Sequence, residues 1–239
     1  MIEPFVGAGS IFLNTDYEHY LLADINHDLI SCFQYLQSEK QIFIEYCRQF
    51  FQEQYNIKES FLNLRTQFNA TNDKRLKAAL FLYLNRHCFN GLMRYNQEGQ
   101  FNTSFGEYRK PYFPDVEMLA FVNKLQSAEF ICSDYKKTME KAITGDIIYC
   151  DPPYVPLSVT ANFTKYHSTG FNRSDQENLV FMARKLAKKG IPVIISNHDT
   201  EFVQNLYFGA NIISFDVQRS ISCQGNKRGK APELLAVFD

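Results

Sequence analysis

The stretch Asp146-Ile-Ile-Tyr-Cys-Asp-Pro-Pro-Tyr154 predicts a buried strand with polar and aromatic groups at its carboxyl end. Its apolar run, 147–150, is typical of a strand covered on both faces in an α/β sheet. Pro152 and Pro153 have no N–H group and a fixed φ, so the chain leaves the sheet in a stiff direction. Asp151 then stands in the crevice beyond the strand ends, where open α/β sheets bind ligands. The stretch therefore predicts an α/β fold with a ligand site beside Asp151.

A glycine-containing turn near the start of the chain predicts a second part of that site. Glu3-Pro-Phe-Val-Gly-Ala-Gly-Ser10 follows the tail of a predicted strand and precedes a predicted helix. Gly7 and Gly9 allow a sharp turn and a close approach of the backbone to a ligand. A dinucleotide fingerprint would need a third glycine where Phe12 stands, so the pattern does not favour NAD(P). An ordinary surface turn remains the alternative.

Further strands are predicted with acids at their ends. Tyr20-Leu-Leu-Ala-Asp24 ends in the residue type that binds ribose hydroxyls in nucleotide-binding α/β folds. The alternative is that Asp24 caps a helix over 25–36, but the preceding glycine turn favours the cofactor. Asp134 follows a predicted strand at 130–133, where it could hold an adenine or an amino group. Three more predicted strands complete the sheet: 192–196, 212–217 and 234–238. Before the first of these strands, Ser174 or Asp175 is expected to cap a helix that runs to about Lys189.

The middle of the chain has helical rather than strand periodicity. Apolar residues recur at helical spacing over 42–51, 61–68 and 74–84, with Asn72 or Asp73 as the expected cap of the last segment. No parallel-strand pattern interrupts them, which predicts a helical insertion. We therefore expect a discontinuous core formed by residues 1–36 and 128–239, and an inserted domain over residues 37–127.

Residues 85–114 within this insertion are polar, aromatic and punctuated by glycine, around a predicted hairpin turn at 96–99. Basic side chains outnumber acids there: Arg86, Arg94, Arg109 and Lys110 against Glu98 and Glu107. Aromatic side chains interleaved with arginine suit contact with nucleic acid. The alternative is an aromatic hairpin packed on its own helices.

The composition excludes several classes of protein. Of the 239 residues 45% are apolar, enough for a core, yet no run of about 18 apolar residues could span a membrane. The net charge of −1 gives no general attraction to nucleic acid, so a DNA site must come from local clustering. The six scattered cysteines form no Cys-x-x-Cys pair, which predicts reduced thiols in the cytoplasm. The histidines show no zinc spacing, so no metal is expected.

Four motifs, in order along the chain, resemble those of the bacterial Dam-type DNA adenine methyltransferases. They are Phe5-Val-Gly-Ala-Gly-Ser10, Asn85-Arg-x-x-x-Asn-Gly-Leu-x-Arg-Tyr-Asn96, Asp151-Pro-Pro-Tyr154 and Ile195-Ser-Asn-His-Asp199. The resemblance covers almost the whole chain. It implies a Rossmann-like methyltransferase core with a mixed, mostly parallel sheet, plus an inserted, mostly helical DNA-recognition domain with a β-hairpin. The implied reaction moves a methyl group from S-adenosylmethionine to the exocyclic amine of a flipped adenine, in GATC, without a metal. The implied partner is double-stranded DNA, bound by a cytoplasmic monomer.

The implied chemistry explains the residue types. An aromatic amine is a poor nucleophile, because its lone pair is delocalised into the ring. Two acceptors, the Asp151 carboxylate and the Pro152 carbonyl, can hold its N–H bonds out of plane and aim the lone pair at the sulfonium methyl. Tyr154 would stack on the base. The implied catalytic set is Asp151, Pro152, Pro153 and Tyr154. The implied cofactor set is Phe5, Gly7, Gly9, Ser10, Asp24, Asp134 and Asp151.

The resemblance also implies residues that contact DNA. Arg94 would read guanine through O6 and N7, the pairing that its fork geometry suits. Leu92 would lie against a thymine methyl, and Phe89 would be the wedge in the base stack. The full DNA-binding set is Phe89, Asn90, Leu92, Arg94, Asn96, Tyr108 and Lys110.

Two alternatives to an active DNA enzyme remain at this stage. Members of the family carry a segment before the glycine turn that closes over the cofactor, whereas Met1 here stands almost at the turn. One alternative is therefore an N-terminally truncated, inactive DNA-binding remnant. The other is an amino-group methyltransferase acting on RNA or protein. Asp151, rather than Asn, before Pro-Pro-Tyr and the presence of Arg94 argue against that alternative.

Overall fold

The computed structural model describes residues 1–155, 171–218 and 230–239. Residues 156–170 and 219–229 lie outside the described residues. They include most of a polar loop that the sequence predicts over 155–173, and of a basic loop over 219–230 that is a candidate for contact with phosphates. The chain divides into two compact units. The sheet unit comprises Met1–Phe12, Asp16–Ile25 and Ser133–Asp239, and the helical unit comprises Leu13–Thr15 and Asn26–Cys132. The assignment of a catalytic core and an inserted recognition domain to residues 1–36 with 128–239 and to 37–127 remains a prediction.

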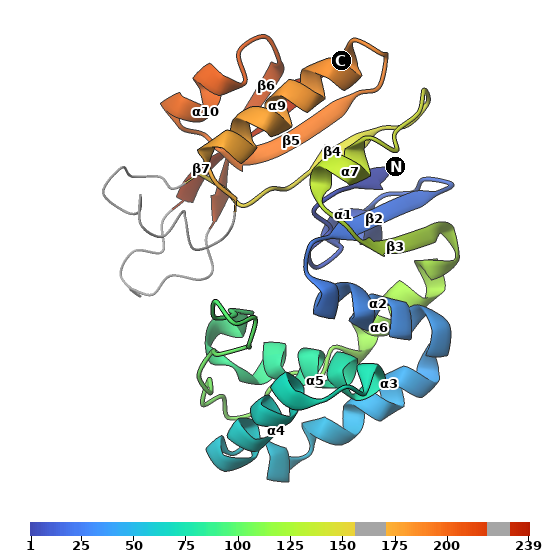
Figure 1. Cartoon of the computed structure of the whole chain (residues 1–239), viewed down its shortest axis with the longest axis vertical. Coiled ribbons are helices and arrows are strands. Elements are labelled where there is room, and N and C mark those ends of the chain that lie inside the picture. Colours follow the sequence, from blue (N-terminus) through green and yellow to red (C-terminus); the bar gives the residue numbers. More distant parts are fainter. Residues whose placement is uncertain (156–170, 219–229) are drawn as a thin grey trace. The chain divides into compact units, whose positions relative to one another are not determined.

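The sheet unit is built on a mixed, mostly parallel sheet (Figure 1). Its strands are β1 (Ile2–Glu3), β2 (Tyr20–Asp24), β4 (Ile148–Cys150), β5 (Val193–His198), β6 (Asn211–Gln218) and β7 (Lys230–Phe238). Within the unit they follow the order β2-β1-β4-β5-β7-β6. The pairs from β2 to β5 are parallel, and β7 is antiparallel to both β5 and β6. In register, Ile148 of β4 faces Ile2 on one side and Val193 on the other. The expected α/β fold is confirmed.

Helices beside this sheet are α1 (Ser10–Asn14), α7 (Tyr135–Met139), α9 (Arg173–Ala187) and α10 (Glu201–Leu206). Helix α9 packs on β5 and β7 (Figure 1) and buries Leu179, Val180 and Ala183 in the core. The prediction that Ser174 or Asp175 caps α9 is wrong. Asn172 is the cap, because its side chain accepts from the Asp175 N–H while the Asp175 carboxylate accepts from the Asn172 N–H.

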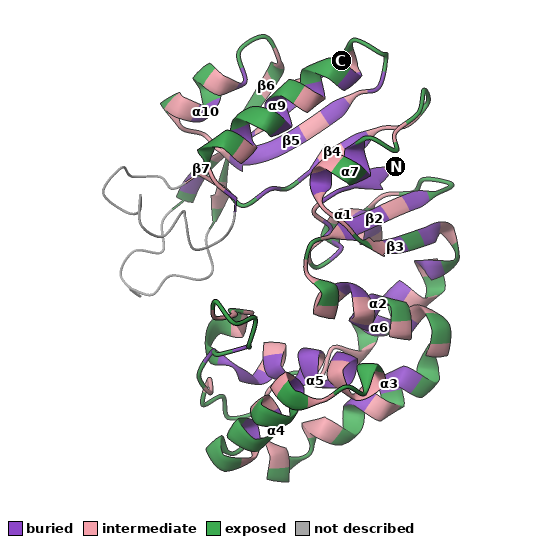
Figure 2. Cartoon of the chain, in the orientation of Figure 1, coloured by how far each residue is buried: buried purple, intermediate pink, exposed green. Residues whose placement is uncertain are grey.

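The helical unit packs its helices around α5. Its elements are α2 (His27–Glu39), α3 (Gln41–Arg48), α4 (Lys58–Ala70), α5 (Lys74–His87), α6 (Asp115–Lys124), the 3₁₀ turns Gln49–Phe51, Glu53–Tyr55, Phe89–Gly91 and Leu125–Ser127, and β3 (Ala128–Cys132). Helix α5 contacts α2, α3 and α4, and its inner face is buried (Figure 2). Asp73 caps α5, as one of the two expected residues. The alternative of Asp24 as a helix cap is wrong, because Asn26 caps α2.

The hairpin turn predicted at 96–99 is present in the helical unit. The Asn96 side chain accepts from the backbone N–H groups of Glu98 and Gln100, and Tyr95 and Phe101 form an isolated antiparallel bridge. In the three described ranges, no helix is long and apolar enough to cross a bilayer. The five described cysteines are free thiols: Cys32, Cys47, Cys88, Cys132 and Cys150.

Candidate active site

A crevice of about 710 Å³ opens in the sheet unit at the carboxyl ends of β1, β2 and β4. Its lining comes from five short segments of the chain: Pro4, Phe5 and Gly7; Asp24 and Ile25; Ser133, Asp134 and Tyr135; Asp151, Pro152, Pro153 and Tyr154; Phe171 and Asp175. All four expected catalytic residues are in this lining, together with Phe5, Gly7, Asp24 and Asp134 from the expected cofactor set. Gly9 and Ser10 are not part of the lining. The structure therefore brings together most of the expected groups, although their roles remain predictions.

The glycine turn has the geometry that its sequence demands. Gly7 and Gly9 have φ angles of 48° and 73°, in the left-handed region that favours glycine. The Gly7 N–H donates to the Asp24 carboxylate at 3.2 Å, and the Gly9 N–H donates to the Val6 carbonyl at 2.8 Å. Asp24 thus fixes the turn that borders the crevice.

Four carboxylates give the crevice an acidic lining: Asp24, Asp134, Asp151 and Asp175. Asp134 caps α7 by accepting from the Lys136 N–H at 2.9 Å. Asp175 forms an ion pair of 3.8 Å with Lys136. A site lined in this way attracts a cationic ligand.

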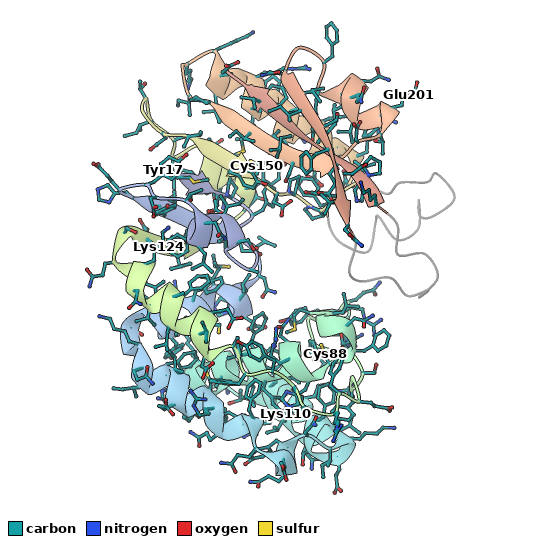
Figure 3. All side chains as sticks on the ribbon, turned by 180° about the vertical axis from the view of Figure 1, so that it is seen from behind. Tyr17, Cys88, Lys110, Lys124, Cys150 and Glu201 are labelled. Atoms are coloured by element: carbon teal, nitrogen blue, oxygen red, sulfur yellow. The ribbon has the colours of Figure 1, made fainter. Side chains whose placement is uncertain are left out.

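Asp151 is held by a group from the neighbouring strand. Cys150, labelled in Figure 3, pairs with Ile195 in the register of β4 and β5, which places Ser196 beside Asp151. The Ser196 hydroxyl lies 2.7 Å from Asp151 Oδ1 and 3.2 Å from the Cys150 carbonyl oxygen. A hydrogen bond to a carboxylate is charge-assisted, so Ser196 orients the acid.

The turn that follows Asp151 is held by two buried amides. Gln176 Nε2 donates to the Pro153 carbonyl at 2.9 Å, and Asn197 Oδ1 accepts from the Val155 N–H at 3.1 Å. The two side chains also bond to each other, with 3.2 Å between Asn197 Nδ2 and Gln176 Oε1. Sequence analysis placed Asn197 in a motif but assigned it no role, and it missed Gln176. Gln176 differs from the exposed polar residues of α9 only in being buried. The helical pattern of the surrounding sequence does not reveal that burial.

Aromatic rings form the apolar part of the crevice wall. Phe5 stacks on Tyr135 at 5.4 Å between centroids and meets Phe171 edge-on at 5.6 Å. The Tyr154 ring meets His198 edge-on at 4.8 Å. Burial raises the pKa of Tyr154, so its hydroxyl stays protonated at neutral pH.

Glu3 is a buried carboxyl that sequence analysis did not single out. It ends β1, is 2% exposed, and its Oε1 has no hydrogen-bond partner. Burial, and then the negative charge of Asp151, raise the pKa of Glu3 to about 7. While Glu3 is protonated, it places no second negative charge near Asp151.

The expected DNA-binding residues lie in the helical unit, and several stand at its surface. Phe89 and Leu92 are 50% and 51% exposed, and Lys110, labelled in Figure 3, is exposed as well. Phe101 is buried against Phe68, so the alternative of a packed hairpin holds for Phe101. Tyr108 is 39% exposed.

Two of these residues have a fixed geometry. Arg94 donates from Nε to Asn102 Oδ1 at 2.7 Å and from Nη2 to the Asn102 carbonyl at 3.3 Å. Asn90 has a φ of 53° and donates its N–H to the Tyr108 hydroxyl at 2.8 Å. Gly106 makes this approach of Tyr108 possible, because a Cβ at Gly106 would lie 2.4 Å from the Tyr108 ring.

Comparison with known proteins decides the family. A family model described as D12 class N6 adenine-specific DNA methyltransferase matches residues 1–221. The chain belongs to this family. The resemblance seen in the four motifs and the expected enzyme class, an adenine-specific DNA methyltransferase, are thereby confirmed.

Relatives of this methyltransferase are similar over its whole length. It is 51% identical to a DNA adenine methylase of Vibrio cholerae, with 100% of this chain and 86% of the relative covered. Identities to DNA adenine methylases of Serratia marcescens and Escherichia coli K12 are 48% and 46%, with all of this chain and 88% and 86% of the relatives covered. A solved chain described as a conserved hypothetical protein from Streptococcus pyogenes is 10% identical, with 100% of this chain and 84% of that chain covered. Its TM-score of 0.35 is too low to inform the fold.

Proposed function

We propose that this methyltransferase moves the methyl group of S-adenosylmethionine to the exocyclic amine of an adenine flipped out of duplex DNA, in the sequence GATC. One observation carries the proposal: the glycine turn, Asp24 and Asp134 share a crevice with Asp151-Pro-Pro-Tyr154. A methyl donor and a methyl acceptor must meet within one such cavity. The GATC preference is supported by the Asn85–Asn96 motif, and the adenine target by relatives named DNA adenine methylase.

The lining of the crevice suits S-adenosylmethionine, which supplies an electrophilic methyl group on a sulfonium cation. Four carboxylates favour a ligand that carries positive charge. Asp24, at the end of β2, is the residue type that accepts from ribose hydroxyls. Asp134 would accept from the adenine amino group of the cofactor, and the ring of Phe5 would pack on its apolar surface.

Asp151 and the Pro152 carbonyl would act on the target amine. Both are acceptors, so they hold the two N–H bonds and leave the nitrogen lone pair directed at the methyl carbon. The nitrogen would gain positive charge as it takes the methyl group from the sulfonium, and the Asp151 carboxylate would stabilise that charge. The nitrogen then loses one proton to water. Tyr154 would stack on the base, with its hydroxyl protonated.

Surface residues of the helical unit would read the DNA. Asn102 occupies Nε and one N–H of Nη2 in Arg94, which leaves Nη1 and the second Nη2 hydrogen for O6 and N7 of guanine. Phe89 would fill the gap left by the flipped base, and Leu92 would contact a thymine methyl. The remaining members, Asn90, Asn96, Tyr108 and Lys110, would contact the duplex nearby. The enzyme would act as a monomer.

A protection assay tests the proposal. The chain is incubated with S-adenosylmethionine and a GATC duplex, which is then exposed to a nuclease that adenine methylation blocks. We expect protection of this duplex, and no methyl uptake by a duplex in which 2-aminopurine replaces the target adenine, because that base lacks the exocyclic amine at the reacting position. Complete cleavage of the GATC duplex, or preferred methylation of an RNA of the same sequence, would overturn the proposal.

A further inference from the structure

The two amides beneath the Asp151-Pro-Pro-Tyr154 turn have one arrangement of donors and acceptors. Asn197 Oδ1 accepts from the backbone N–H groups of Val155 and His198, at 3.1 and 2.9 Å. Its Nδ2 therefore faces the Tyr207 hydroxyl and Gln176 Oε1, at 3.0 and 3.2 Å. Because Oε1 of Gln176 is the acceptor, Nε2 must be the group that meets the Pro153 carbonyl. Rotating either amide by 180° would set like groups against each other.

The two amide side chains of this network are buried. Both Gln176 and Asn197 are 0% exposed, so neither side chain has water as a substitute partner. The peptide nitrogens of Pro152 and Pro153 carry no hydrogen. This part of the chain therefore lacks two donors for the backbone hydrogen bonds of a sheet. In a buried setting a fully satisfied set of polar groups specifies one conformation.

Ser196 and the two amides contact the chain before and after the Pro152 carbonyl, which is the proposed second acceptor of the target amine. Both prolines have a fixed φ, so the orientation of the turn depends mainly on the two ψ angles. Ser196 holds Asp151 on one side, at 2.7 Å, and Gln176 holds the Pro153 carbonyl on the other, at 2.9 Å. Asn197 fixes the next peptide through the Val155 N–H.

We propose that Gln176 and Asn197 are positioning residues for methyl transfer: they set the direction of the Pro152 carbonyl relative to the Asp151 carboxylate. The inference rests on the proposed function, since it concerns the same turn. Gln176 belongs to α9, and none of the expected site residues lies in this helix. The inference therefore assigns α9 a role in catalysis. A misplacement of about 1 Å in a reacting group costs on the order of 10²-fold in rate.

Substitution of Gln176→Met tests the inference, with Gln37→Met as the matched control. Methionine keeps the length of glutamine and removes the amide. Gln37 likewise donates from Nε2 to backbone carbonyls, those of Leu125 and Ala128, both at 2.8 Å, but in the helical unit. We expect Gln176→Met to lower kcat by about 10²-fold, with KM for duplex and for S-adenosylmethionine within a factor of about three. Gln37→Met should lower the thermal midpoint but leave kcat unchanged.

Gln176→Glu adds a readout that a purely structural role would not move. In this variant an oxygen replaces Nε2 and faces the Pro153 carbonyl, so the ionised side chain repels it while the protonated side chain donates to it. The kcat of the variant, divided by that of the unsubstituted chain at the same pH, should therefore rise as pH falls. The ratio cancels the titration of groups present in both proteins, including Asp151, Asp175, His198 and Tyr207. For Gln176→Met the ratio should be independent of pH.

The outcomes separate the two proposals. If the unsubstituted chain methylates no duplex, the proposed function fails and the positioning role fails with it. If that chain is active and Gln176→Met retains the kcat of the Gln37→Met control, or the Gln176→Glu ratio does not change with pH, the positioning role alone is rejected. Circular dichroism at each pH identifies any variant that does not fold, and a folded Gln176→Glu at low pH still decides the question if Gln176→Met unfolds.

Discussion

The crevice in the sheet unit and the 88–108 segment of the helical unit differ in how far their functional side chains are held by buried partners. In the crevice, Asp151 and the turn after it are fixed by buried groups on β5 and α9. In the 88–108 segment the backbone is fixed, through bonds from Arg65 to Thr103 and from Asn69 to Phe101, while Phe89 and Leu92 remain half exposed. The difference follows from the two tasks. Orienting a weak nucleophile needs acceptors that do not move, whereas reading DNA needs surface groups that complete their contacts on the duplex.

The largest effect should come from Asp151→Ala. We expect kcat to fall by on the order of 10³-fold or more, because the variant loses the acceptor that orients the amine and stabilises its charge. Stability should change little, since Asp151 is exposed and Ser196 keeps the Cys150 carbonyl as a partner. Single-turnover methylation and thermal unfolding measure the two quantities. A variant with normal single-turnover rates but weak DNA binding would break the distinction between the two regions.

Glu3→Gln sharpens the electrostatic side of the comparison. The pKa of Glu3 is raised from 4.5 to about 7, so between these values the folded chain holds a proton that the unfolded chain has lost. Stability therefore falls as pH rises through this window, by on the order of 3 kcal/mol in all. Glutamine does not titrate, so the variant should lack this fall. Urea unfolding at pH 5 and pH 8 measures the difference, and equal pH slopes for both proteins would contradict it.

His87 in the helical unit should respond to pH in the opposite direction, with an effect of similar size. Burial lowers the pKa of His87 from 6.5 to about 4, and its Nδ1 lies 2.8 Å from the Tyr83 carbonyl, to which it donates. Between these values the unfolded chain binds the extra proton, so stability is lost as pH falls through the window. His87→Phe should lose less stability than the unsubstituted chain between pH 6.5 and pH 4. Denaturant unfolding across this range tests the sign, and an unchanged acid loss would refute the assignment.

The smallest of these effects should be that of Arg94→Ala. We expect a cost of about 1–3 kcal/mol on GATC and a relaxed choice of base at one position. Lys110→Ala is the comparison: it should weaken matched and mismatched duplexes alike and flatten the salt dependence. Competition binding over a set of single-base variants of GATC measures both. Equal losses on every sequence for Arg94→Ala would remove its reading role.

The sequence predicted those features that depend on neighbours along the chain. The strands ending at Asp24 and Asp151 are bounded apolar runs, and the carboxyl ends of parallel strands meet at one edge, so their acids were expected together. The features that it did not predict depend on packing between distant segments. The burial of Glu3 and Gln176 arises only when β1 and α9 are packed in the core. The cap of α9 was misplaced because Asn172 and Ser174 are both good cap formers, and the return bond from Asp175 decides between them.

Nucleoside analysis of the methylated product tests the central claim most directly. A GATC duplex is incubated with S-adenosylmethionine that carries a trideuterated methyl group, and the digested nucleosides are separated and weighed by mass spectrometry. The account predicts N6-trideuteromethyladenine from the unsubstituted chain and, in the same incubation time, an amount lower by on the order of 10³-fold or more from Asp151→Ala, at a cofactor concentration that saturates both proteins. Label on another base, or equal amounts of labelled adenine from the two proteins, would contradict it.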